Sequence, residues 1–80
     1  MRLVSEITTM EELERIFLLA HAGNEDVFIE LEMEGFEGNE LIANPPENIL
    51  PKLEYYKNTY DETLNHKYAK GIRIVSFGIM

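Results

Sequence analysis

Apolar and charged residues alternate along residues 27–33, which read VFIELEM. Val27, Ile29, Leu31 and Met33 occupy the odd positions, whereas two glutamates occupy the even positions 30 and 32. A period of two is typical of a strand with one buried and one exposed face. We therefore predict a strand here, with its aliphatic side chains turned into the core and its glutamates turned to solvent.

A helical period precedes this strand. Apolar residues recur at spacings of three and four at Met10, Leu13, Ile16, Phe17 and Ala20. Thr8 and Thr9 each lie three residues before a glutamate, and either pair forms a capping box at a helix start. Gly23 can adopt the left-handed conformation that ends a helix. These signals predict a helix at about residues 9–22.

A turn must follow the alternating strand. Gly38-Asn39 matches a two-residue hairpin loop, so Glu40–Asn44 is expected to return as the partner strand. A bulge at Gly35 would change the face on which Phe36 lies, and the pattern leaves that face open.

The second helical stripe consists of Ile49, Leu53, Tyr56, Tyr60 and Leu64. If Asn44 capped this helix, Pro51 would fall in its interior at a cost of about 3 kcal/mol. If Asn48 caps it, Pro51 lies in the first turn, where the missing amide proton has no helical partner anyway. We therefore predict a helix at roughly residues 48–64.

Two further strands complete the pattern. GIRIVSF, residues 71–77, has apolar side chains on both faces, which favours a central position in a sheet. Leu3, Val4 and Ile7 indicate a short first strand. The order β-α-β-β-α-β predicts a single α+β domain over residues 1–80, with a ferredoxin-like antiparallel sheet and both helices on one face. If the first strand does not form, a three-stranded α+β layer remains.

The charge is strongly asymmetric. The net charge is −8; residues 1–50 hold twelve acids against two arginines, whereas residues 51–80 carry a small positive excess. The acidic half would repel phosphate, which argues against direct binding of nucleic acid. A partner protein with a basic surface remains compatible, and solubility is the alternative reason for the charge.

The chain has no cysteine, which excludes disulfides and thiolate zinc sites and fits a reducing cytoplasm. The start, MRLVSEITT, lacks the apolar run of a signal peptide. Outside the predicted strands the longest apolar stretch is Ile16–Ala20, far shorter than a membrane span. We expect a cytoplasmic protein that does not enter a membrane.

Residues that could support catalysis are few. His21 lies at the end of the first helix, where a cation favours the helix dipole. His66 follows Glu62 by four residues, but one carboxylate and one imidazole bind metal poorly without further ligands. An enzyme would need Asp61, Glu62 and His66 to converge in a pocket. We expect no enzymatic activity, no cofactor and no metal site.

The carboxylates offer a different kind of site. Side chains at i and i+2 of a strand lie ~6.7 Å apart, so Glu30, Glu32 and Glu34 match every second phosphate of a nucleic-acid strand. Glu37 and Glu40 would extend this row, and Tyr55, which lies off its helical stripe, would add an exposed aromatic contact. The alternative is that charge on a half-exposed strand prevents edge-to-edge aggregation.

The segments NPPEN, KLEYYKNTYDE and GIRIVSF lie within residues 40–77, about half of the chain. This stretch resembles segments of small uncharacterised proteins from phages and prophages of Gram-positive bacteria. The resemblance implies an accessory protein that acts inside the bacterial host cell, and it supplies no catalytic residues.

Together these observations predict a non-enzymatic interaction module, encoded by a phage. It would bind a host protein of basic surface through its acidic sheet and hairpin, as a mimic of nucleic acid. The alternative is a small self-associating structural protein. In that case a homodimer contact would involve Leu18, Leu19, Phe36 and Tyr55.

Overall fold

The structure is a computed structural model that describes residues 3–80. Its elements, in chain order, are β1 (Leu3–Val4), α1 (Met10–Ala22), β2 (Val27–Met33), β3 (Glu40–Asn44), α2 (Ile49–Thr59) and β4 (Ile72–Ile79). A short 3₁₀ helix, η1 (Pro46–Asn48), leads into α2. The predicted β-α-β-β-α-β order is confirmed.

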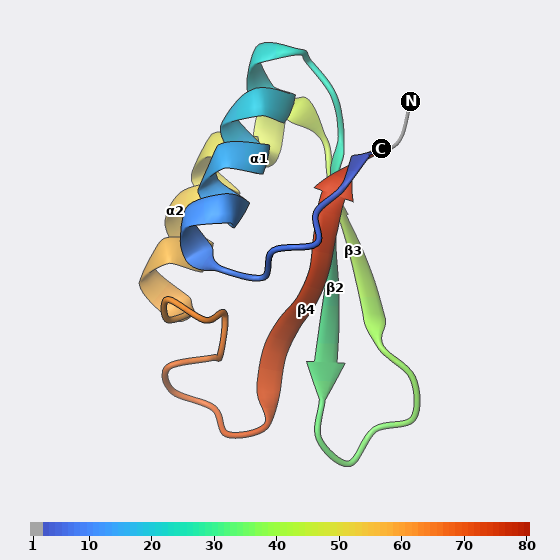
Figure 1. Ribbon diagram of the computed structural model, residues 1–80, viewed down its shortest axis with the longest axis vertical. Coiled ribbons are helices and arrows are strands. Elements are labelled where there is room, and N and C mark those ends of the chain that lie inside the picture. The colour runs from blue at the N-terminus through green and yellow to red at the C-terminus, as the bar shows by residue number, and fades with distance from the viewer. Residues whose placement is uncertain (1–2) are drawn as a thin grey trace.

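The strands form one antiparallel sheet in the order β1-β4-β2-β3. Each of the two helices therefore connects a pair of parallel strands that have one antiparallel strand between them, which is ferredoxin-like in outline. β1 has two residues, so the three longer strands make up most of the sheet. β4 is central, as its apolar residues on both faces predicted. Both helices cover the same face of the sheet (Figure 1).

The core lies between the helices and this face. α1 contributes Leu13, Ile16, Phe17 and Ala20, and α2 contributes Ile49, Leu53 and Tyr56. Val27 and Ile29 of β2 are fully buried, and Leu31 is partly buried against the same cluster. The predicted inward orientation of the odd-numbered residues of β2 is therefore confirmed.

α1 begins and ends close to the predicted residues, but the backbone conformation at its C-terminal cap differs from the prediction. The Thr9 hydroxyl accepts a hydrogen bond from the Glu12 amide at 3.2 Å, which caps the helix. Gly23 has a φ of −89°, so it does not adopt the left-handed conformation predicted for it. Asn24 does so instead, with a φ of 54°. The Gly23 N–H still donates to the Leu19 carbonyl, so the chain reverses one residue later than expected.

The connection between β2 and β3 differs from the predicted two-residue hairpin. Residues 34–39 form the loop, and Leu31 pairs with Glu40. The turn begins earlier because Gly35 adopts a φ of 86° and the Phe36 N–H donates to the Met33 carbonyl. Phe36 therefore lies in the loop and is exposed rather than on either sheet face.

The second helix begins as predicted, with Asn48 in the N-cap position and Pro51 in the first turn. It ends at Thr59 instead of residue 64, because Tyr60 is extended and the next residues form a separate turn. The Asp61 carboxylate accepts hydrogen bonds from the Thr63 and Asn65 amides, which competes with helix formation. Leu64 is buried, as its place on the stripe suggested, but it has a φ of 66°.

Candidate functional site

The sheet has one face that carries no helix (Figure 1), and two of the six predicted site residues, Glu30 and Glu32, lie on it. Residues paired across antiparallel strands share a face, so the register identifies its members. Phe28 lies between Gly78 and Ala43, and Glu30 lies between Ser76 and Leu41. We call this surface the open face; it consists of Val4, Phe28, Glu30, Glu32, Leu41, Ala43, Arg73, Ser76 and Gly78.

An apolar hollow occupies the part of the open face next to β3. Phe28, Leu41, Ala43 and Met80 line it, together with Ile42, and its volume is about 490 Å³. Phe28 forms its base and is only 5 % exposed, whereas Leu41 is 66 % exposed at its rim. We call this feature the β3 hollow. It offers an apolar side chain of a partner a place to become buried.

Two of the predicted glutamates lie together on the open face. Glu30 Oε2 accepts a hydrogen bond from the side-chain amide of Asn39 (Nδ2) at 2.8 Å. Glu32 faces Arg73 across the strand pair, with Nε and Oε1 4.0 Å apart and both side chains 54 % exposed. An exposed pair at this distance contributes little to stability. Arg73 nevertheless interrupts the run of negative charge that the sequence predicted.

The other predicted site residues are distributed more widely. Glu34 lies at the end of the strand pair beside Gly71, and Glu37 is exposed in the β2–β3 loop. Glu40 is opposite Leu31, which places it on the helix-covered face and not on the open face. Tyr55 lies on α2, where Lys52 Nζ is 5.3 Å from its ring centroid. The structure therefore does not bring Glu40 or Tyr55 to the surface that carries Glu30 and Glu32.

Glu40 contributes to the pKa shifts of two core tyrosines. Burial raises the pKa of Tyr60 to about 12, and the charges of Tyr55, Tyr56 and Glu40 add to this shift. Burial likewise raises the pKa of Tyr56, again with a contribution from Glu40. Both tyrosines belong to the core between the helices and the sheet, which is the side of the sheet on which the strand register places Glu40.

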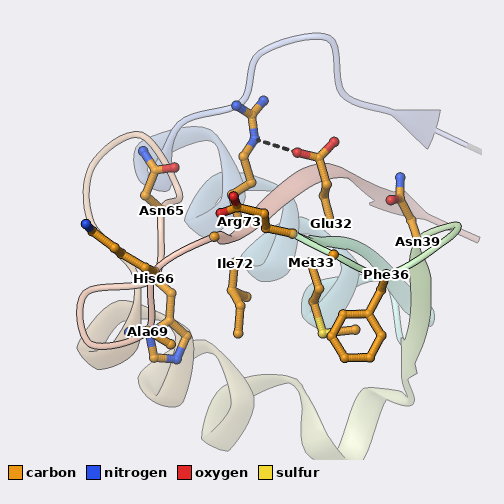
Figure 2. Close-up of a pocket in the computed structure, with 13 residues that line it drawn as sticks. Glu32, Met33, Phe36, Asn39, Asn65, His66, Ala69, Ile72 and Arg73 are labelled. Carbon is orange, nitrogen blue, oxygen red and sulfur yellow. Dashed lines mark hydrogen bonds and ion pairs between the residues drawn. The ribbon is translucent and has the colours of Figure 1, made fainter.

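A second hollow, of about 610 Å³, lies at the end of the sheet between the β2–β3 loop and the segment that precedes β4. Figure 2 shows that its residues divide between two sides of the strand pair. Met33, Phe36 and Ile72 point to one side, while Glu32 and Arg73 point to the other. The polar groups and the apolar surface of this hollow therefore do not converge on one point, as they do in typical small-ligand sites.

His66 borders the second hollow, but its ring forms hydrogen bonds with the backbone. Its Nδ1 accepts hydrogen bonds from the Tyr68 and Ala69 amides at 3.1 and 2.9 Å, which order the loop around it. Asp61 accepts in the same way from amides of its own turn, and the hydrogen bond from Asn65 is the main reason that its pKa is lowered. Within residues 3–80, histidine, aspartate and glutamate side chains form no group of three that could hold a metal.

Sequence reasoning missed the apolar half of the open face. Leu41 and Ala43 alternate with Ile42 in the segment ELIAN, and this period assigns them to the face opposite Ile42. Phe28 lies at an even position of β2, so the same alternation placed it beside Glu30. Met80 could not be assigned to this hollow, because its place depends on the tertiary structure.

Comparison with models of protein families, with curated proteins and with solved structures finds no match for this chain. In the part of the chain that the structure describes, no helix has the length and apolar character needed to cross a bilayer.

Proposed function

We propose that this protein is a non-enzymatic interaction module that binds a partner protein through the open face of its sheet. The observation that carries the proposal is that both helices cover one face of the sheet (Figure 1), while the other face has an apolar hollow with Glu30 next to its rim residue Leu41. An apolar anchor site with charge at its rim is the arrangement found at specific protein interfaces.

The charge supports a partner with a basic surface. From residue 16 to residue 51 the chain has no lysine or arginine, whereas residues 25–47, which include β2 and β3, hold eight carboxylates. Such a field speeds the encounter with a cationic surface and disfavours phosphate. The partner that fits is therefore a basic protein, and direct binding of nucleic acid is not part of the proposal.

The resemblance of residues 40–77 to small phage and prophage proteins extends the proposal to a bacterial host protein in the cytoplasm. A groove that normally holds nucleic acid has the required positive charge. Glu30 and Glu32 lie at i and i+2 on one face, so they supply two phosphate-like charges. Glu40 does not extend the row on this face, so mimicry depends on fewer charges than the sequence predicted.

The test is the double substitution Glu30→Lys with Glu32→Lys. Partners are captured from a bacterial lysate with the wild-type protein, and the association rate of each purified partner is then measured at several salt concentrations. We expect the association rate to fall about tenfold or more in the double variant, and its salt dependence to flatten, because steering by complementary charge is lost.

Glu54→Lys with Glu62→Lys is the matched control. It changes the net charge by the same amount at exposed positions of α2 and of the segment after it. If both double variants slow association equally, net charge rather than the open face determines binding. If Glu30→Lys with Glu32→Lys binds like the wild type, the acidic-face proposal is wrong.

Self-association is a second candidate function, and one observation favours it. Leu18 and Leu19, neighbours on α1, are 46 % and 49 % exposed. A pair of exposed leucines on one helix can form a helix–helix contact between two copies. Sedimentation equilibrium of the wild type and of Leu18→Gln tests this candidate: a monomer at high micromolar concentration contradicts it.

A further inference from the structure

The edge of the sheet at β3 has hydrogen-bonding capacity that the fold does not use. In the sheet formed by residues 3–80, β3 pairs with β2 on one side only. Alternate backbone N–H and C=O groups of its five residues therefore point away from the sheet. The opposite edge, β1, has two residues, so β3 offers the longer edge for strand addition.

The β3 hollow lies directly beside this edge. Leu41 and Ala43 belong to the edge strand itself, and both contribute to the hollow on the open face. A strand added next to β3 would place alternate side chains on that face, about 6.7 Å apart. One of these side chains would therefore lie beside Leu41 or Ala43, where an apolar group would become buried.

The charge around the β3 edge determines which kind of segment can bind there. Glu37 and Glu40 are exposed at one end of β3, Glu47 is exposed beyond the other end, and Glu30 is its neighbour on β2. No lysine or arginine occurs between Arg15 and Lys52 to balance them. A second copy of this chain would bring the same carboxylates to the contact, whereas a cationic segment would neutralise them.

We propose that β3 accepts an extended, cationic segment of a partner protein as an added strand of the sheet. An apolar side chain of this segment enters the β3 hollow on the open face, and its alternate lysine or arginine side chains lie on the opposite face, near Glu40. Main-chain hydrogen bonds supply affinity in this mode, and alternate side chains supply selectivity. The inference rests on the proposed function and specifies the form of the basic partner.

The probe is a capped peptide of about eight residues in which lysine and valine alternate. Its control is a peptide of equal length and charge in which lysine and proline alternate, because proline removes every second amide and disfavours a strand. Binding is followed by amide hydrogen exchange of the full-length protein. When about 90 % of the protein is bound, we expect the outward amides of residues 40–44 to exchange about tenfold more slowly, because exchange proceeds from the free form.

Two substitutions test the role of the β3 hollow. Leu41→Gln removes the apolar rim at a mostly exposed position, so we expect it to weaken peptide binding about tenfold without unfolding the protein. Leu50→Gln is the matched control, because Leu50 is also an exposed leucine but lies on α2. We expect it to leave binding unchanged.

Three outcomes overturn the inference: equal binding of the lysine–proline peptide, protection of amides outside β3 only, or a dimer formed through β3 that strengthens with salt. The proposed function is judged separately by the Glu30→Lys with Glu32→Lys variant and the captured partner. If that variant loses the partner while the partner never protects the β3 amides, the open face remains the binding surface and strand addition is wrong. If β3 is protected but charge reversal has no effect, the acidic-face proposal fails instead.

Discussion

Glu12 is the carboxylate most closely tied to the folded state. Its oxygens accept hydrogen bonds from Arg15 Nε at 2.7 Å and Arg15 Nη2 at 2.8 Å, and from the Ser5 hydroxyl at 3.0 Å. The Arg15 hydrogen bond is the main reason that the pKa of Glu12 is lowered from 4.5 to about 2. Glu12 thus connects α1 to the segment that follows β1.

This shift predicts a specific loss of stability in acid. The unfolded chain takes up a proton on Glu12 near pH 4.5, whereas the folded chain does so only near pH 2. The contribution of Glu12 to stability is therefore present above pH 4.5 and is lost as the pH falls through 2. We expect Glu12→Gln to be less stable than the wild type at pH 7, and the difference to shrink towards pH 2.

Urea denaturation at pH 7, 4.5 and 2.5 measures this difference. Glu11→Gln, one residue earlier and exposed, is the control, and its stability relative to the wild type should not follow the same pH profile. A constant difference between Glu12→Gln and the wild type over this range would contradict the assignment.

Individual residues also show where sequence patterns do not predict the backbone conformation. Asn24 and Leu64 adopt positive φ values of 54° and 66°. The first is a residue type that tolerates this conformation, but Gly23 beside it was the stronger signal. The second is a leucine, which tolerates it poorly, and only the burial of its side chain and the turn around Asp61 explain it.

At the level of elements, helices and strands with a regular pattern of apolar residues were predicted correctly. The stripe of α1, the alternation of β2 and the apolar character of β4 all predicted their elements, because the packing of each element imposes a regular pattern on its apolar residues. The errors are at connections. The turn at Gly35 and the end of α2 depend on competing local hydrogen bonds. The spacing of apolar residues does not predict such hydrogen bonds.

The same limit applies to the candidate site. The even positions of β2 correctly placed Glu30 and Glu32 on one face. The side of Glu40 depends on the register that the loop imposes, and the ion pair of Glu32 depends on which residue of β4 lies opposite. That residue is Arg73 because a bulge at Val75 shifts the register between Glu30 and Leu31.

Gly71 joins the β2–β3 loop to the segment before β4. Its φ is 80°, its carbonyl accepts a hydrogen bond from the Glu34 N–H at 2.8 Å, and a Cβ at this position would lie 2.7 Å from the Glu34 Cβ. Gly38 has a similar φ of 74° with nothing within 4 Å of the same position. Alanine substitutions at the two glycines therefore distinguish two costs. Both positions have the cost of backbone strain, and Gly71 also has the cost of steric contact.

We expect Gly38→Ala to lower the free energy of unfolding by about 1 kcal/mol, the cost of a left-handed alanine. Gly71→Ala should cost about 1–3 kcal/mol more, because the Glu34 side chain and backbone must also move. Urea denaturation of both variants measures the difference. Equal losses in the free energy of unfolding would show that the chain near Glu34 can move aside at no energetic cost.

At the scale of the whole molecule, the charge is poorly compensated within the fold. Two of the three ion pairs formed by residues 3–80 lie on the helices or between them, at Arg15–Glu12 and Lys57–Glu14. The eight carboxylates of residues 25–47 lie on β2, on β3 and in the segments that flank these strands, and Arg73 near Glu32 is their cationic contact among the described residues. Folding brings these carboxylates together and raises their mutual repulsion.

We therefore expect moderate salt to stabilise this protein. Raising the ionic strength from about 0.01 M to 0.15 M shortens the screening length from about 30 Å to about 8 Å. The melting temperature should rise by about 4 °C or more if about 1 kcal/mol of repulsion is screened. Scanning calorimetry measures it, and Glu25→Lys with Glu37→Lys should reduce the salt response. A melting temperature that falls with salt would contradict this account.

The position of β4 also constrains how the chain acquires its structure. β2 lies between β3 and β4, yet β4 is some forty residues further along the chain and is the last of the strands. Until residues 72–79 leave the ribosome, β2 and the two helices have no central strand against which to close. We expect the β2–β3 hairpin and the apolar stripes to reach their final packing only after β4 has joined the sheet.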